Sequence, residues 1–222
     1  MNHVQSRAIV SVLGLTLTLL VAPLTAVAEA PTPVDESRLV PSLSAAFAPW
    51  TCQTKQNGPV CRGESHRSWG WSPSDLPCVD TQLWVRGDSD RYQTRYYTED
   101  YLDGFREFRT HDIDYLSTSP DGPATATITT NVRFEEPFAV PGDDQTITIV
   151  THGVLWDIRS VQGPAVWRAV GTLIEPPDAV GTFSGHVTDG STTTRYEDTP
   201  LPEVLSDDTF IAAVCAAATS TG

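Results

Sequence analysis

The chain has 222 residues and a formal net charge of −14, with 28 acidic against 14 basic side chains. That length is enough for one domain with a substantial core. An acidic balance of this size disfavours nucleic acid and anionic membranes as partners, because both are bound mainly through lysine and arginine. We therefore expect no nucleic-acid binding, and no membrane association once an export signal has been removed.

The amino-terminal residues have the pattern of such a signal. Arg7 supplies a positive start, residues 8–27 are mostly apolar, and Ala26 and Ala28 provide the small side chains that a signal peptidase requires. We predict a signal peptide over residues 1–28, removed to give a secreted protein that is extracellular or associated with the cell wall. No later apolar stretch approaches the roughly 18 residues of a membrane span.

Four cysteines follow the predicted signal: Cys52, Cys61, Cys78 and Cys215. In an oxidising compartment we expect two structural disulfides. The sequence has no Cys-x-x-Cys motif, the spacing that would indicate a metal or redox site. Four cysteines allow three pairings. We favour Cys52–Cys61, across a short turn, and Cys78–Cys215, which would tie the first half of the chain to its tail. We predict no bound metal or cofactor.

The next two segments lack a clear periodic pattern. Residues 29–50 contain four prolines and are predicted to form an irregular leader. Residues 51–81 hold three of the cysteines together with several prolines and glycines. We predict that they form a disulfide-stapled loop region within a single β-rich domain, 51–222.

From residue 82 onward, apolar and polar side chains alternate as in half-buried strands. Candidate strands are 83–86, 92–98, 105–116, 126–134, 146–156, 165–174 and 182–187. Within 165–174 both faces carry apolar groups, which indicates a sheet covered on both sides. Short turns without intervening helices rule out parallel crossovers. We therefore predict an all-β fold, an antiparallel barrel or sandwich of about 7–8 strands.

One helix is predicted near the carboxyl end, over residues 207–218. Ser206 is a suitable N-cap, and Asp207 and Asp208 complement the positive end of the helix dipole. Cys215 lies on the apolar face of this helix, so its disulfide would hold that face against the sheet.

A possible nucleophile follows the strand at 83–86. Gly87-Asp88-Ser89 is similar to the nucleophile turn of GDSL-type esterases, but Asp90 replaces the leucine and no Asp-x-x-His follows to supply a base. A polar hairpin turn is the simpler interpretation.

Carboxylates offer a second kind of chemistry. Asp112 and Asp114 would share one face of a strand as a partial calcium site, whereas adjacent Glu135 and Glu136 would lie on opposite faces. The pattern selects no particular carboxylate pair for glycoside hydrolysis.

Aromatic residues are the better candidates for a ligand site. Trp69 and Trp71 would point the same way on an extended chain, Trp84 follows, and Tyr96 and Tyr97 belong to a second cluster. Exposed rings stack on sugars, and tyrosines can line the mouth of a barrel that holds a small apolar ligand. The alternative is that these rings complete the core.

Several segments carry a family resemblance: Arg95-Tyr96-Tyr97-Thr98-Glu99-Asp100, then 105–114, the Pro-Asp-Gly turn, and Val214-Cys215-Ala216-Ala217. In pattern and order, about residues 78–218 resemble loosely related, uncharacterised secreted β-rich proteins of actinobacteria. The resemblance implies export, a β-meander and a cysteine in a terminal helix. It implies no activity.

The sequence thus favours a secreted, non-catalytic binding or interaction domain. Its ligand would be a small apolar molecule held within the sheet, or an extracellular protein. Two alternatives remain open. One is an extracellular hydrolase, esterase-like or glycosidase-like, with Ser89 or a carboxylate pair at its centre. The other is a secreted protease inhibitor that presents the 53–60 loop.

Overall fold

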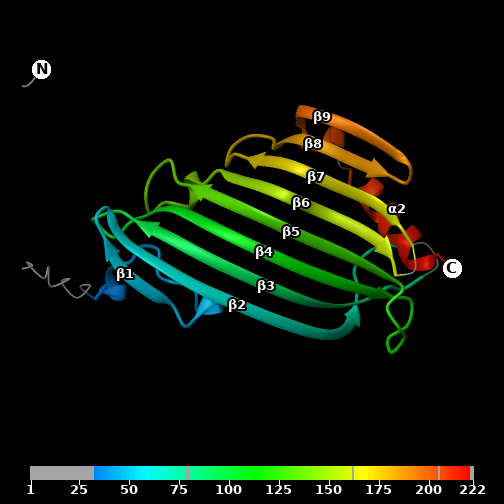
Figure 1. Ribbon diagram of the computed structural model, residues 1–222, viewed down its shortest axis with the longest axis horizontal. Coiled ribbons are helices and arrows are strands. Elements are labelled where there is room, and N and C mark those ends of the chain that lie inside the picture. Colours follow the sequence, from blue (N-terminus) through cyan, green and yellow to red (C-terminus); the bar gives the residue numbers. More distant parts are fainter. Residues whose placement is uncertain (1–32, 79–80, 162, 205, 221–222) are drawn as a thin grey trace, which may run out of the picture. The chain divides into compact units, whose positions relative to one another are not determined.

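The computed structural model describes residues 33–78, 81–161, 163–204 and 206–220, so the predicted signal peptide lies outside the described residues. The described chain forms one antiparallel sheet in which each strand pairs with the next along the chain (Figure 1). Its nine strands are β1 (Thr51–Lys55), β2 (Gly58–Pro73), β3 (Trp84–Tyr97), β4 (Asp103–Ser117), β5 (Ala126–Pro137), β6 (Ile149–Ser160), β7 (Ala165–Glu175), β8 (Thr182–Asp189) and β9 (Thr192–Pro200).

The sheet is open. β1 and β9 are its two edges, and no ladder joins them within the described ranges. The prediction of a mainly antiparallel β fold is therefore confirmed. The prediction of a barrel or sandwich of 7–8 strands was imprecise, because the structure has a single open sheet of nine strands. On the second apolar face of β7, Ile174 is 38% exposed, and no second sheet covers this face in the described part of the chain.

Helical segments occur before, between and after the strands. They are the 3-10 turns η1 (Glu36–Arg38), η2 (Ala45–Phe47) and η3 (Asp144–Thr146), the short α1 (Leu201–Val204), and α2 (Asp207–Thr219). The predicted carboxyl-terminal helix is confirmed as α2, where the Ser206 hydroxyl accepts a hydrogen bond from the Thr209 backbone N–H at 3.2 Å. Among the described residues, no helix has the length and apolar character needed to cross a membrane.

Helix α2 covers one end of one sheet face, which we call the inner face. Trp167 of β7 and Phe183 of β8 are buried in the core that α2 completes with Val214. The ring of Phe210 packs edge-on against Trp167, with centroids 6.2 Å apart. The Cys78–Cys215 disulfide then joins α2 to the segment that leads from β2 into β3.

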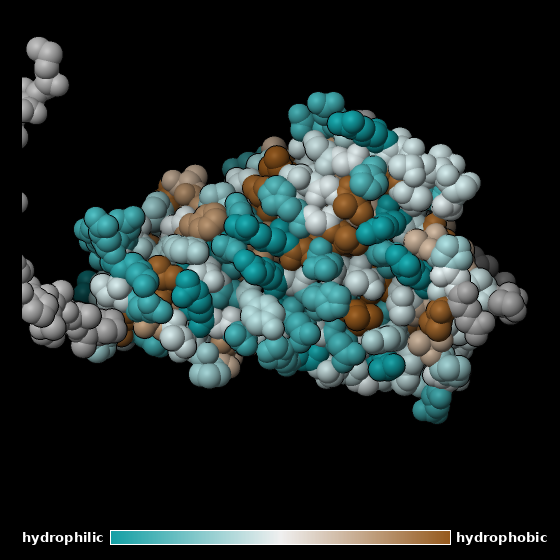
Figure 2. All heavy atoms as spheres, in the orientation of Figure 1, coloured by the Kyte–Doolittle hydropathy of each residue, from teal (hydrophilic) through white to brown (hydrophobic). Residues whose placement is uncertain are grey.

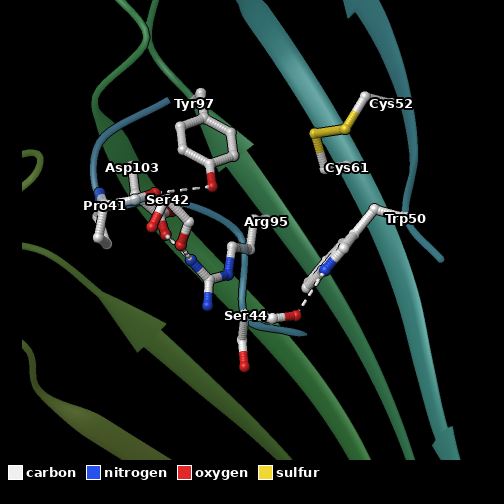
Figure 3. The surroundings of a disulfide bond; sticks show 9 residues. All are labelled: Pro41, Ser42, Ser44, Trp50, Cys52, Cys61, Arg95, Tyr97 and Asp103. Atoms are coloured by element: carbon white, nitrogen blue, oxygen red, sulfur yellow. Dashed lines mark hydrogen bonds and ion pairs between the residues drawn. A yellow bond between two sulfur atoms is a disulfide. The ribbon is translucent and has the colours of Figure 1, made fainter. Parts of the chain in front are cut away.

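The leader covers the other end of the inner face (Figure 3). The ring of Phe47 in η2 lies 6.1 Å from that of Phe108 in β4, and the Trp50 indole donates a hydrogen bond to the Ser44 carbonyl at 2.8 Å. Nearby, the Cys52–Cys61 disulfide links directly opposed residues of β1 and β2. Both disulfides are the pairs that the sequence favours.

Two predictions about the first half of the chain were wrong. Residues 51–73 form β1 and the sixteen-residue β2 rather than a loop region. Much of β2 carries polar side chains on both faces, so it lacks the alternating pattern that marks half-buried strands. Likewise, Gly87-Asp88-Ser89 lies in the middle of β3 and not in a turn, which removes the esterase-like setting of Ser89.

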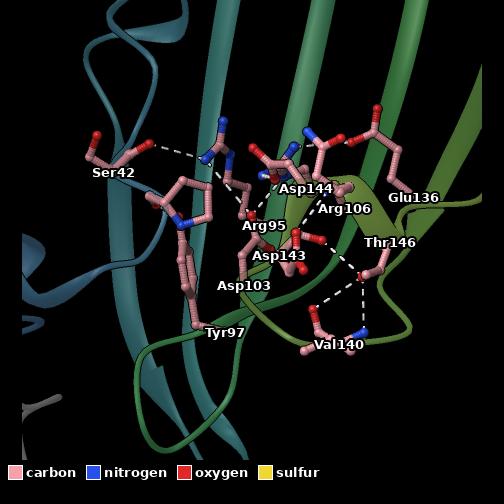
Figure 4. A network of polar contacts seen from close by, with 12 residues as sticks. Ser42, Arg95, Tyr97, Asp103, Arg106, Glu136, Val140, Asp143, Asp144 and Thr146 are labelled. Atoms are coloured by element: carbon pink, nitrogen blue, oxygen red, sulfur yellow. Dashed lines mark hydrogen bonds and ion pairs between the residues drawn. The ribbon is translucent and has the colours of Figure 1, made fainter. Parts of the chain in front are cut away.

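A buried ion-pair network fixes the leader end of the sheet (Figure 4). The Asp103 side chain is fully buried, and its Oδ2 atom accepts a hydrogen bond from Arg106 Nε at 2.7 Å. Arg106 extends the network to Glu136, at 3.3 Å, and to Asp144 of η3, at 2.7 Å. One arginine therefore joins three carboxylates from β4, β5 and η3.

The same network anchors the leader. The backbone N–H of Asp103 donates to the Val40 carbonyl at 2.8 Å. Arg95, whose Nη1 lies 3.8 Å from Asp103 Oδ2, donates to the Ser42 carbonyl at 3.2 Å. The Tyr97 hydroxyl donates to the Pro41 carbonyl at 3.3 Å. These three contacts all use carbonyl groups of the leader, which its side-chain sequence does not reveal.

Replacement of both Cys78 and Cys215 by serine should destabilise the protein more than replacement of Cys52 and Cys61. The two bridges span 137 and 9 residues, which corresponds to about 5 and about 2.5 kcal/mol in the chain-entropy model. Urea unfolding of the two double variants measures the difference. Equal losses would show that loop entropy does not set the contribution of these bonds.

Asp103→Ala should lower the free energy of unfolding by about 3–5 kcal/mol, because it leaves buried Arg106 and Arg95 without their shared carboxylate. Asp100→Ala is a matched control, since Asp100 is exposed in the neighbouring β3–β4 turn. Chemical denaturation of both variants tests this expectation. A loss no larger than that of Asp100→Ala would contradict a stabilising role for the network.

Candidate functional site

The structure does not bring the five predicted aromatic residues together. Trp69 lies on the inner face, where its ring sits beside Gly87. Trp71 lies on the opposite, outer face, where the Arg86 guanidinium is 5.4 Å from its ring centroid. An irregularity in the β2–β3 register between Trp69 and Ser72 separates the two tryptophans, so the expectation that they point the same way was wrong.

The other three predicted residues occupy different surroundings again. Trp84 begins β3 and lines a hollow with Thr219 and Ser220 at the end of α2. Tyr96 lies against Phe105, with ring centroids 5.5 Å apart. Tyr97 is only 4% exposed and belongs to the cluster beneath the leader. Burial raises the pKa of the Tyr97 hydroxyl above its ordinary value.

A hollow of about 400 Å³ lies on the outer face over the middle strands, and we call it the outer hollow. The residues around it are Arg62 of β2, Asp90, Tyr92 and Thr94 of β3, Glu107, Arg109, Thr110 and His111 of β4, and Asn131 of β5. Figure 2 shows the face of the sheet opposite α2, where hydrophilic residues spread across the middle and hydrophobic patches are scattered.

Strand pairing determines how these side chains are placed. Tyr92 is directly opposite Arg109, and Asp90 is opposite His111, which in turn is opposite Asn131. The Tyr92 ring is 44% exposed although it lies among charged groups. The outer hollow therefore surrounds one accessible aromatic ring with hydrogen-bonding groups from four adjacent strands.

Several polar groups of the outer hollow have no protein partner. Within the described part of the chain, the side chains of Arg62, His111 and Asn131 make no hydrogen bond or ion pair with another side chain. Glu107 is engaged, since its Oε1 lies 3.4 Å from Arg133 Nε and 3.7 Å from Arg109 Nη2. The site thus offers unpaired donors and acceptors beside the exposed ring.

His66 of β2 borders this site. Its Nδ1 atom lies 2.7 Å from Asp90 Oδ1 and its Nε2 atom 3.5 Å from Glu64 Oε2. The hydrogen bond with Asp90, and then that with Glu64, raises the pKa of His66 above its ordinary value. The imidazole ring also packs edge-on against Tyr92, with centroids 5.8 Å apart, so it helps to position the exposed ring.

A second hollow, of about 680 Å³, lies beside the buried network and includes Arg106, Glu136 and Asp144. It is larger, but these three side chains already satisfy one another (Figure 4). A ligand there would have to compete with existing ion pairs. The outer hollow is therefore the better candidate binding site.

Comparison with known protein families, with curated proteins and with solved structures found no match. Across the residues that the structure describes, no group of three or more His, Cys, Asp or Glu side chains is arranged to hold a metal ion. The functional argument therefore depends on the geometry of this chain alone.

Sequence reasoning selected Tyr96 and Tyr97 but not Tyr92 or the residues that surround it in the outer hollow. Residues 90, 92 and 94 are every second residue of the chain, which indicates that their side chains lie on one face of a strand. That pattern is also typical of any solvated strand. Only the pairing of β2 to β5 shows that these residues gather around one hollow.

Asp90→Asn should lower the pKa of His66 towards its ordinary value, and Glu64→Gln should lower it less, because the hydrogen bond with Asp90 is the main cause of the shift. Titration of the imidazole signals by NMR gives both values. A His66 pKa that is insensitive to Asp90→Asn would contradict the pairing.

Proposed function

We propose that the protein is a secreted binding domain that holds a neutral, polyhydroxylated ligand such as an oligosaccharide in the outer hollow. The observation that carries this proposal is the exposed Tyr92 ring among unpaired polar side chains. Two disulfides, which persist mainly in oxidising compartments, support secretion.

The chemistry of the outer hollow favours a polar ligand over an apolar one. Four of its side chains are formally charged: Arg62, Arg109, Asp90 and Glu107. An apolar molecule that covered them would remove their hydration without replacing their hydrogen bonds. Hydroxyl groups both donate and accept, so a sugar can bond to guanidinium, carboxylate and amide groups at once.

The balance of charge favours a neutral ligand. Two arginines and two carboxylates line the outer hollow, so neither sign dominates. The flat ring of Tyr92 can contact the C–H face of a sugar, while the planar side chains of Arg62, Arg109 and Asn131 reach its hydroxyl groups. In this arrangement the ring contributes contact area and the polar groups contribute orientation.

Tyr92→Ala should lower affinity for a bound oligosaccharide at least about tenfold, since burial of a large apolar side chain contributes about 1.5–3 kcal/mol. Residues 29–222 would be tested on an array of immobilised neutral oligosaccharides, and hits would be measured by calorimetry. Tyr96→Ala is the matched control, because Tyr96 lies on the same strand but not among the residues around the outer hollow.

Two results would contradict the proposal. One is the absence of binding to any neutral oligosaccharide. The other is binding that Tyr92→Ala leaves unchanged. Tight binding of the apolar dye N-phenyl-1-naphthylamine, lost in Tyr92→Ala, would instead point to an apolar ligand at this site.

A further inference from the structure

A polar strip crosses the middle of the inner face, between the leader and α2. It is formed by β2, β3 and β4 (Figure 1). Trp69 is 41% exposed there, and the side chain of Arg91 is 49% exposed. The strip is therefore open to solvent although it lies on the face that holds the core.

Asp112 of β4 is held rigidly in this strip. Its Oδ1 atom accepts a hydrogen bond from the Ser89 hydroxyl at 2.6 Å, and its Oδ2 atom accepts one from Arg91 Nη2 at 2.7 Å. Ser89 is only 5% exposed and Arg91 anchors the other side of the carboxylate. Ser89 thus positions a carboxylate, a role unlike that of a nucleophile.

Asp114 lies two residues further along the same strand and on the same face, with its Cα about 6.6 Å from that of Asp112. Among the described residues it has no hydrogen-bond or ion-pair partner. A Cβ atom on Gly87 would come within 2.7 Å of Asp114 Oδ1 and would overlap the Trp69 ring. The absence of a side chain at Gly87 therefore lets the free carboxylate and the exposed indole lie side by side.

The strip contains a second polar group without a hydrogen-bond partner among the described residues. Thr110, two residues before Asp112 on the same face and opposite Arg91, is 6% exposed. Its hydroxyl has no hydrogen-bond partner within the described part of the chain. A buried hydroxyl without a partner is costly, so the strip contains an unsatisfied polar group beside Asp112.

We propose that Asp112, Asp114 and Trp69 form a glycoside-hydrolysing site on the inner face. Trp69 stacks against one sugar ring, Asp114 is the general acid and Asp112 the general base. This inference does not rest on the binding role of the outer hollow, because the two sites lie on opposite faces of the sheet.

The reaction consumes one water molecule. The Asp114 carboxyl gives its proton to the glycosidic oxygen as the bond from that oxygen to the anomeric carbon breaks. Water adds to the anomeric carbon and gives its proton to the Asp112 carboxylate. Proton exchange with solvent then restores both groups. Two carboxyl groups in these separate roles are the usual requirement for this hydrolysis.

The electrostatics of Asp114 suit a general acid. Burial raises its pKa above the ordinary value, and the neighbouring Asp112 carboxylate adds to the shift. A carboxyl whose folded-state pKa is raised contributes stability when protonated, and this contribution is lost as the pH rises through that pKa. The ionised Asp114 side chain therefore destabilises the fold at neutral pH. Such a cost is expected of a carboxyl group that serves catalysis.

The test measures the release of reducing sugar from a panel of unactivated α- and β-linked disaccharides by residues 29–222, because a sugar leaving group needs the proton that a general acid supplies. We expect release by the wild type, and a fall of about 10²–10⁴-fold in kcat for Asp114→Asn, the range of general acid–base catalysis. Asp88→Asn is the matched control, since Asp88 lies in β3 opposite Ile113 on the outer face. Asp114→Asn should also be at least as stable as the wild type at pH 7.

Three outcomes would overturn the proposal: no release from any glycoside, activity retained in Asp114→Asn, or equal losses in Asp114→Asn and Asp88→Asn. Because stability is measured on the same variants, a lost activity is not mistaken for a failure to fold. Tyr92→Ala should keep its hydrolytic activity, so this proposal and that for the outer hollow fail independently.

Discussion

A single open sheet has one apolar face to bury, and the need to cover that face constrains the rest of the structure. Two segments far apart in the chain do so. The leader covers one end and is held by the buried Asp103 network, whereas α2 covers the other end and is held by the Cys78–Cys215 bond. Each cover is therefore joined to the rest of the fold by a specific link in addition to its apolar contacts.

These covers leave two surfaces available for function. Between them lies the inner strip with Asp112 and Asp114, and on the opposite face lies the outer hollow around Tyr92. Both are built on β3 and β4, which are paired on both sides and therefore rigid. Side chains on such strands hold their positions better than those on loops.

Sequence reasoning succeeded where apolar residues recur with the period of a strand or a helix. The alternation in 165–174 identified the strand β7, although it wrongly indicated cover on both faces, and the signals in 207–218 identified α2. It failed for β2 and the centre of β3, because those strands carry polar groups on both faces and contain glycine. The same property hid the candidate sites, since a polar strand face has the same pattern whether it binds a ligand or only water.

The sequence by itself determined that the chain is antiparallel and β-rich, with a terminal helix, because alternation, short turns and helix caps are local signals. Only the tertiary structure decided that the sheet stays open, which carboxylate is left unpaired, and which polar residues gather around Tyr92. Those features depend on strand register and on contacts such as Asp103 with the leader backbone. Such contacts join residues far apart in the chain, and no local pattern encodes them.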